Sequence, residues 1–356
     1  MPTLFDPVRL GAIEMANRVV MAPMTRSRAD DGDIPGDMVA EYYAQRASAG
    51  LIITEGAQPS ADGKGYCRTP GLFNEAQVEA WAKVNAGVHA KGGRIVLQVM
   101  HVGRIASALN KDAGTRTVAP SAIQAQGKIF TDVEGMVPFD MPEELTTAEV
   151  AEVIAELGRC AKLAKQANFD GVELHCASGY LPMQFLSTGT NTRTDQYGGP
   201  VENRIRFAVE AIDAMAAEIG ADRVGFRIAP GNPFNDLHDD NHPETYAALL
   251  DALDGKGLAY CHLVDMHLDW LDSRALLAKH WSGPTILNES IELPEAQELV
   301  AKGGADAVSF GRFYIANPDL VERFRDGLPL ATFGSKALYA GGAEGYIDFP
   351  PHGADA

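Results

Sequence analysis

An imidazole, a hydroxyl and a phenol stand close together in the chain as His175, Ser178 and Tyr180. The apolar run 171–174 precedes them, which predicts that they follow a buried strand. An imidazole or hydroxyl at such a place can hydrogen-bond a substrate oxygen. A phenol, with a pKa near 10, is a poor base for hydrolysis but can donate a proton to a developing carbanion. A lone histidine at a strand end is often only a structural residue, so both interpretations of His175 stay open here.

The ends of other apolar runs carry a second set of residues, most of them polar or small. If these runs are parallel strands of one barrel, their carboxyl ends meet on one face, where active sites form. Amide, hydroxyl and guanidinium groups with few carboxylates suit a planar heterocycle with carbonyls and ring nitrogens. The set consists of Pro23, Met24, Thr25, Gly56, Gln98, Met100, Arg227, Asn288, Gly311 and Arg312.

Arg227 alternates with Phe226 and Ile228, which places its guanidinium inside the barrel or at its rim. A buried cation needs an anionic partner. A reduced flavin supplies one, because negative charge gathers at its N1–C2=O edge. An ion pair with a barrel carboxylate such as Glu173 is the alternative. Near the last predicted strand, Gly311 and Arg312 form a weak signal for phosphate, which such barrels often bind after strands seven and eight.

Short β-branched runs alternate with amphipathic segments, which is typical of a parallel sheet covered by helices. Eight strands with a helical stretch after each predict an α/β fold, a single (β/α)8 TIM barrel. We expect the strands at 19–21, 51–54, 95–99, 171–174, 224–228, 260–264, 285–287 and 307–310. Helices are expected, among others, at 37–48, 75–90, 147–167, 201–219 and 293–302.

Three segments add to a minimal barrel within one domain, 1–356. Residues 1–16 predict an N-terminal hairpin that plugs the barrel floor. Residues 102–146 are too long for an ordinary connection after strand three, and we expect them to cap the catalytic face. Residues 328–356 form a C-terminal tail.

Composition and missing motifs exclude several classes of protein. The net charge of −18 argues against nucleic acid as a partner. Four separated cysteines and the lack of a signal peptide or an apolar span predict a cytoplasmic protein without membrane or iron–sulfur contacts. No Rossmann glycine motif or nucleophile elbow is present, so a nicotinamide would bind only transiently. The metal-like run 238–242 is expected to be a surface loop, and no metal site is predicted.

Many ordered blocks of the chain resemble the Old Yellow Enzyme family of FMN-dependent ene-reductases. The resemblance covers nearly the whole chain and is far more specific than any single motif. The blocks are Leu4-Phe5-Asp6-Pro7, Ala22-Pro23-Met24-Thr25-Arg26, Glu41-Tyr42-Tyr43-Ala44-Gln45-Arg46-Ala47, Gly65-Tyr66, Gly103-Arg104, Asn191-Thr192-Arg193-Thr194-Asp195-Gln196-Tyr197-Gly198-Gly199, Phe310-Gly311-Arg312, Asn317-Pro318-Asp319-Leu320 and Gly345-Tyr346.

The resemblance implies non-covalent FMN, with NAD(P)H as a transient electron donor. Thr25 would hydrogen-bond the flavin near C4=O, Gln98 its pyrimidine edge, and Arg227 would face N1 and the C2 carbonyl. Gly311 and Arg312 would hold the phosphate. The implied cofactor-binding residues are Pro23, Met24, Thr25, Gly56, Gln98, Arg227, Asn288, Gly311 and Arg312.

The resemblance also implies the reaction, which is reduction of the C=C bond of an enone or nitroalkene, with nitroesters as further substrates. His175 and a partner would hold the substrate oxygen. Hydride would pass from flavin N5 to the β-carbon, and Tyr180 would protonate the α-carbon. The substrate side would be lined by Tyr66, Met100 and Tyr346. The protein would act on such small molecules as a monomer or homodimer.

Two departures from the family pattern bear on the site. Ser178 stands where the family has Asn or His, so one direct bond from His175 and a water bridge to Ser178 are expected to hold the substrate oxygen. Asn288-Glu289-Ser290 stands where many members have a glycine pair near the phosphate. Because a carboxylate would repel phosphate, we expect Glu289 to point outward. Met100 replaces a common aromatic residue, which would widen the pocket.

Two other functions remain open from the sequence. One is a non-flavin barrel lyase or hydrolase that uses His175 and Tyr180. The other is a protein that binds FMN with weak or altered turnover because of Ser178. Visible flavin absorption, and its bleaching and recovery under anaerobic conditions, distinguish these from an ene-reductase.

Overall fold

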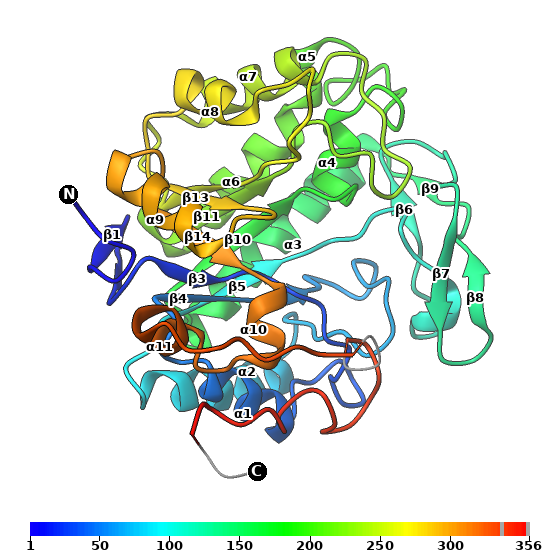
Figure 1. Cartoon of the computed structure of the whole chain (residues 1–356). Coiled ribbons are helices and arrows are strands. Elements are labelled where there is room, and N and C mark those ends of the chain that lie inside the picture. Colours follow the sequence, from blue (N-terminus) through cyan, green and yellow to red (C-terminus); the bar gives the residue numbers. More distant parts are fainter. Residues whose placement is uncertain (335–337, 354–356) are drawn as a thin grey trace.

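A closed barrel of eight parallel strands forms the centre of the computed structural model, which describes residues 1–334 and 338–353 (Figure 1). Around the barrel the strands run in the order β10-β11-β12-β13-β14-β3-β4-β5. The predicted barrel is therefore confirmed. The strands are β3 (Val19–Met21), β4 (Leu51–Ala57), β5 (Ile95–Val99), β10 (Gly171–Cys176), β11 (Val224–Ile228), β12 (Tyr260–Val264), β13 (Thr285–Asn288) and β14 (Ala307–Phe310).

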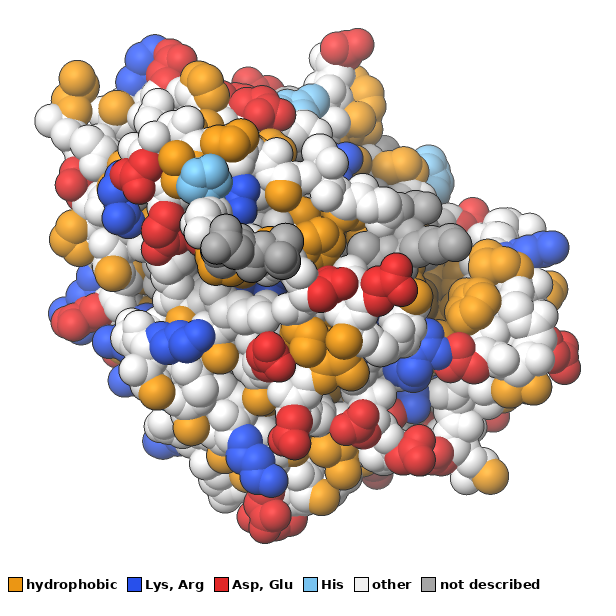
Figure 2. Space-filling model, turned by 60° about the horizontal axis from the view of Figure 1, so that its bottom comes forward, with side chains coloured by type: hydrophobic (Ala, Val, Ile, Leu, Met, Phe, Trp, Pro, Cys, Tyr) orange, Lys and Arg blue, Asp and Glu red, His pale blue; other side chains and the backbone are white. Residues whose placement is uncertain are grey.

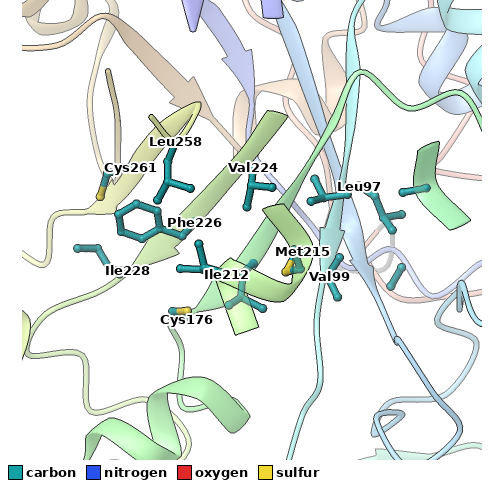
Figure 3. Close-up of a cluster of buried hydrophobic side chains, with 14 of the residues drawn as sticks. Leu97, Val99, Cys176, Ile212, Met215, Val224, Phe226, Ile228, Leu258 and Cys261 are labelled. Atoms are coloured by element: carbon teal, nitrogen blue, oxygen red, sulfur yellow. The ribbon is translucent and has the colours of Figure 1, made fainter. Parts of the chain in front are cut away.

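Alternate residues of each strand face the helices. On β11, Val224, Phe226 and Ile228 join the large outer core, whereas Arg227 lies on the opposite side of the strand. Figure 3 shows Phe226 among side chains from neighbouring strands and from the helix that carries Ile212 and Met215. This alternation leaves the inward positions free for polar groups.

The predicted N-terminal hairpin is β1 (Val8–Leu10) paired with β2 (Ile13–Met15). Its Leu10, Ile13 and Met15 pack with the first inward-facing residues of the barrel strands, such as Val96 and Ile286, in a separate apolar cluster. Burying these side chains closes the amino end of the barrel. The hairpin therefore plugs the floor, as expected.

Helices lie outside the barrel and agree with the predicted segments, with two differences. The first helix ends at Gln45, before the expected Ser48, and the predicted helix 201–219 is divided at Ile205. The helices are α1 (Asp37–Gln45), α2 (Glu75–His89), α3 (Thr147–Gln166), α4 (Leu181–Leu186), α5 (Val201–Arg204), α6 (Arg206–Ile219), α7 (His242–Leu253), α8 (Ser273–His280), α9 (Leu293–Lys302), α10 (Arg312–Ala316) and α11 (Leu320–Asp326). Two short 3₁₀ turns cover Ala108–Asn110 and Ala221–Arg223.

The long excursion after β5 contains two small sheets. One pairs β6 (Val118–Ala119) with β9 (Glu143–Glu144), and the other is the hairpin of β7 (Lys128–Thr131) and β8 (Gly135–Pro138). The hairpin projects at one side of the barrel in Figure 1. Its Ile129 and Phe130 line a cavity together with Tyr180, so the excursion forms a wall over the catalytic face.

Charged side chains of both signs are interspersed on the face shown in Figure 2. Basic residues stand there singly or in small groups among acidic ones, which agrees with the charge of −18. Within residues 1–334 and 338–353, no helix is long and apolar enough to cross a membrane.

Candidate active site

A layer of polar side chains crosses the barrel above its apolar floor. Its members face inward because they alternate with outward apolar residues on their strands. All of them are buried, and together they form one hydrogen-bonded network. They are Gln98, Glu173, Arg227, His262, Asn288 and Ser309.

His262 lies between the cation and the anion of this network. Its Nδ1 is 2.8 Å from Oε2 of Glu173, and one terminal nitrogen of Arg227 lies 2.9 Å from its Nε2 and 3.2 Å from its Nδ1. The carboxylate of Glu173 only accepts, so Nδ1 carries the proton, and Nε2 of the neutral ring is left to accept from Arg227 or Ser309. Burial, with the positive Arg227, accordingly lowers the pKa of His262 to about 4. The Arg227–Glu173 pairing considered from the sequence is thus indirect, through a neutral imidazole.

A cavity of about 1060 Å³ opens above the polar layer, at the carboxyl ends of the strands. Arg227 and Arg312 bring positive charge to its lining, and Thr25 brings a hydroxyl. The short helix α10 begins directly after β14, so Arg312 lies at a helix start beside the loop that follows β13. This is where such barrels hold a phosphate. Seven predicted cofactor residues line the cavity: Pro23, Met24, Thr25, Arg227, Asn288, Gly311 and Arg312.

The two remaining predicted cofactor residues lie inside the barrel near this cavity. Gly56 of β4 is opposite Gln98 of β5, after a register shift in that strand pair. A Cβ at Gly56 would come within 2.5 Å of the sulfur of Met100, so a larger residue there would require the Met100 side chain to move. The amide nitrogen of Gln98 donates to Glu173 at 2.8 Å, which leaves its amide oxygen as an acceptor.

The expected outward orientation of Glu289 is wrong. Its carboxylate lines the cavity and lies 3.4 Å from a terminal nitrogen of Arg312. Glu289 and Ser290 have φ angles of 90° and 51°, a region that side-chain-bearing residues rarely adopt. The backbone therefore keeps the left-handed turn that suits glycine, and this turn brings the carboxylate to the proposed phosphate-binding arginine.

Replacing Glu289 by glutamine is expected to tighten FMN binding roughly fivefold to tenfold. The carboxylate competes with a phosphate for Arg312, and a partly exposed charge pair contributes about 1 kcal/mol. Fluorescence titration of the apoprotein with FMN measures the affinity. Glu295→Gln is the control, because Glu295 pairs with Arg274 and is absent from the cavity lining. Unchanged or weaker binding by Glu289→Gln would contradict this role.

The strand β10 extends to Cys176, two residues beyond the expected end at Leu174, so His175 lies within the strand. It is two residues after Glu173 and therefore on the same side of the strand. Its Nδ1 accepts the backbone N–H of Ala177 at 3.2 Å, so the proton of the neutral ring is on Nε2. Burial, with Arg227 nearby, lowers the pKa of His175 to about 3. His175 is therefore a neutral hydrogen-bond donor at ordinary pH.

Tyr180 packs against His175 with ring centroids 4.8 Å apart, and its hydroxyl lies 3.1 Å from that of Tyr66. Burial raises the pKa of Tyr180 well above its usual value, and the neighbouring Tyr66 adds to this. The phenol stays protonated and able to donate. Both tyrosines line an apolar cavity of about 870 Å³, and Thr25 lines both cavities. The structure thus brings His175 and Tyr180 into contact, with Tyr180 at the edge of this cavity.

Ser178 occupies a turn between His175 and Tyr180 with a φ of 56°. Its carbonyl oxygen accepts a hydrogen bond of 2.8 Å from the side chain of Asn235. Among the described residues, no partner of its hydroxyl is seen. Asn235, Phe234 and Tyr339 also line the apolar cavity and were not among the residues predicted from the sequence. Asn235 and Phe234 lie in the loop that follows β11. Their position after a barrel strand could have identified them as candidates for the site.

Tyr346 does not line the substrate side. It is fully buried and stacks on Tyr42, with ring centroids 4.1 Å apart and the guanidinium of Arg26 over its ring. The tail instead brings Tyr339 to both cavities. Met100 is buried in the apolar cluster that contains Tyr66 and Tyr180, and it is not among the residues that line the apolar cavity.

The run 238–242 is only partly the surface loop that we expected. His238 and Asp240 are exposed, but Asp239 is buried and accepts a hydrogen bond from Thr245, and His242 starts α7. Across the described parts of the chain, no group of three or more His, Cys, Asp or Glu side chains could hold a metal ion.

These features define a (β/α)8-barrel enzyme in which a cofactor-sized cavity adjoins an apolar cavity with acid–base groups. The sequence matches the NADH:flavin oxidoreductase / NADH oxidase family over residues 3–331, and the chain belongs to that family, which includes Old Yellow Enzyme. It is an FMN-dependent NAD(P)H oxidoreductase of the ene-reductase class. The non-flavin alternative is therefore wrong.

Relatives and solved structures agree over nearly the whole chain. The chain is 38% identical to 12-oxophytodienoate reductase 1 of Oryza sativa subsp. japonica, covering 98% of this chain and 92% of the relative. It is 38% identical to a probable flavin mononucleotide-dependent alkene reductase of Leishmania infantum, with 98% and 97% covered. Morphinone reductase in complex with tetrahydroNAD superposes with a TM-score of 0.95 at 43% identity, covering all of both chains. The Old Yellow Enzyme homologue of Zymomonas mobilis gives 0.94 at 37%, with 98% and 99% covered.

Proposed function

We propose that the protein reduces the C=C bond of α,β-unsaturated carbonyl or nitro compounds, and also accepts nitroesters. The observation that carries the proposal is the pair of His175 and Tyr180. A neutral imidazole with its proton on Nε2 packs against a protonated phenol, and the phenol lines an apolar cavity. The first can polarise a substrate oxygen, and the second can protonate the α-carbon.

The lining of the larger cavity fits FMN. Arg312 supplies charge for a phosphate, Arg227 supplies charge for the pyrimidine edge, and Thr25 supplies a hydroxyl for a ring carbonyl. Gln98 presents an amide oxygen from the polar layer. When bound, FMN would supply the two-electron chemistry, with NAD(P)H as the source of the electrons. The chain's own residues bind and orient both molecules and supply the proton.

A substrate oxygen is held by one direct hydrogen bond from His175, with a water bridge to Ser178. The hydroxyl of Ser178 is too short to replace the amide or imidazole that the family usually has there. The hydroxyl of Tyr180 bonds to that of Tyr66, which links the proton donor to the wall of the apolar cavity. Apolar side chains around these groups exclude water from the remainder of the substrate.

An anaerobic two-step assay tests the proposal. The FMN-bound protein is reduced with NADH or NADPH and is then mixed with enones, nitroalkenes and nitroesters. We expect NAD(P)H to bleach the flavin and an enone such as cyclohexenone to restore its absorption, with the saturated ketone as product. Reduction by NAD(P)H without reoxidation by any of these compounds would instead indicate an FMN protein with lost or altered turnover.

Replacing Ser178 by asparagine is expected to speed cyclohexenone reduction roughly tenfold or more, because a lost donor at a developing oxyanion costs about 2–4 kcal/mol. The left-handed backbone at position 178 favours this variant, since asparagine tolerates that region better than most residues. Ser178→Ala is the control. Stopped-flow reoxidation of the reduced flavin measures the rate, and an unchanged or slower rate would contradict this picture of the site.

A further inference from the structure

We propose that Glu173 is a positioning and charge-balancing residue that acts through neutral His262 on Arg227 and thereby sets the reduction potential of the flavin. The inference rests on the proposed placement of the flavin's pyrimidine edge at Gln98 and Arg227. It concerns Glu173 and His262, which line neither cavity themselves but contact Gln98 and Arg227.

Glu173 and Arg227 are charged groups in the same buried layer without a direct contact. Glu173 is fully buried, and its two carboxylate oxygens accept from Gln98 and His262 at 2.8 Å each. Arg227 donates to Nε2 of His262 and, at 2.6 Å, to the side-chain oxygen of Asn288. A guanidinium has five N–H groups. Most of the donors of Arg227 therefore remain for a ligand, while the carboxylate is held one imidazole away.

His262 is fixed as a spacer by its partners. Glu173 requires a proton on Nδ1, which leaves Nε2 of the neutral ring as an acceptor. The Ser309 hydroxyl lies 2.8 Å from Nε2, and one nitrogen of Arg227 lies beside both ring nitrogens. The neutral imidazole keeps the Glu173 carboxylate and the Arg227 guanidinium from forming a direct ion pair. The arrangement keeps Arg227 directed toward the cavity while the carboxylate offsets part of its charge.

The same carboxylate orients Gln98. A carboxylate accepts only, so the atom of Gln98 at 2.8 Å from Glu173 is the amide nitrogen. One carboxylate thus sets the hydrogen-bonding direction of Gln98 and the charge of Arg227. Because the layer is buried, these charges act at a low effective dielectric constant.

Without the negative charge of Glu173, less of the positive charge of Arg227 is offset. The stronger positive charge favours the reduced flavin, whose N1–C2=O edge is negative. In Glu173→Gln, the side-chain oxygen still accepts from His262, and the amide of Gln98 turns to accept from the new NH₂. We expect the reduced flavin to be favoured about tenfold relative to the wild type, a positive shift of the midpoint potential by about 30 mV for a two-electron couple. Anaerobic titration against reference dyes measures this shift.

His262→Gln is the matched variant. It keeps both charges and replaces one neutral spacer with another that can donate to Glu173 and accept from Arg227. We expect the reduced flavin to be favoured by less than about twofold in this variant. A merely structural role would make His262→Gln as disruptive as Glu173→Gln. Equal shifts in the two variants, or no positive shift in Glu173→Gln, would overturn the proposal.

The protonation state of His262 in the wild-type protein provides a second test, which does not require the midpoint potential of any variant. In ¹⁵N-histidine NMR at pH 7, assigned by difference with His262→Gln, we expect the His262 signals of a neutral ring protonated at Nδ1. An imidazolium or a ring protonated at Nε2 would also overturn the proposal. If the wild type reduces enones but shows either adverse result, only this inference fails; failure of enone reduction alone contradicts the proposed function.

Discussion

Replacing Tyr180 by phenylalanine is expected to slow the reduction of cyclohexenone roughly 10²- to 10⁴-fold, the contribution of a positioned general acid. The ring would remain packed against His175, because their contact is between ring faces and edges. Only the hydroxyl that is held at 3.1 Å from Tyr66 is lost. Its high pKa matters for this step, because a phenol that stays protonated can donate at every pH at which the protein is assayed.

The measurement separates the two halves of the reaction. Stopped-flow reduction of the flavin by NAD(P)H should change less than about fivefold, because that half uses no phenolic proton. The reoxidation by cyclohexenone should carry the whole loss. Tyr66→Phe is the matched control, because it removes the hydroxyl at the other end of the same hydrogen bond. If both variants lose the same activity, the pair acts as a unit and Tyr180 is not the specific donor.

Much of the fold follows from periodicity. Alternation on β11 places Phe226 outward and Arg227 inward, and five of the strands have the expected bounds. The strand that carries His175 was predicted too short, because the prediction ended each strand where its apolar run met a polar residue. Inside a barrel, an inward polar residue continues the strand when neighbours satisfy its hydrogen bonds.

The site was predicted less completely than the fold. Residues on strands and at strand ends, such as Thr25 and Arg312, lie at the expected cavity. Tyr346 does not, because the path of a tail without regular elements is set by tertiary packing, here by the stack on Tyr42. His262 could have been found, since the period-two pattern of β12 places it inward. Its partnership with Glu173 could not, because it joins strands 89 positions apart in the chain.

Replacing His175 by alanine is expected to slow enone reduction roughly 10²- to 10³-fold, the usual loss for one donor to a developing oxyanion. Because Ser178 gives only a water-mediated contact in the proposed site, Ser178→Ala should cost less than about fivefold. Stopped-flow reoxidation by cyclohexenone measures both variants, and spectral titration with a phenol that mimics the enolate measures the loss of oxygen binding.

The pKa of His175 makes this prediction sharper. With a value of about 3, the ring is neutral throughout the range in which the enzyme is assayed. Loss of rate in His175→Ala should therefore be the same at pH 6 and at pH 8. A loss that is confined to low pH would mean that the imidazolium form holds the substrate oxygen. A loss in Ser178→Ala as large as that in His175→Ala would mean that the hydroxyl bonds the oxygen directly, and that the turn at Ser178 closes onto the substrate.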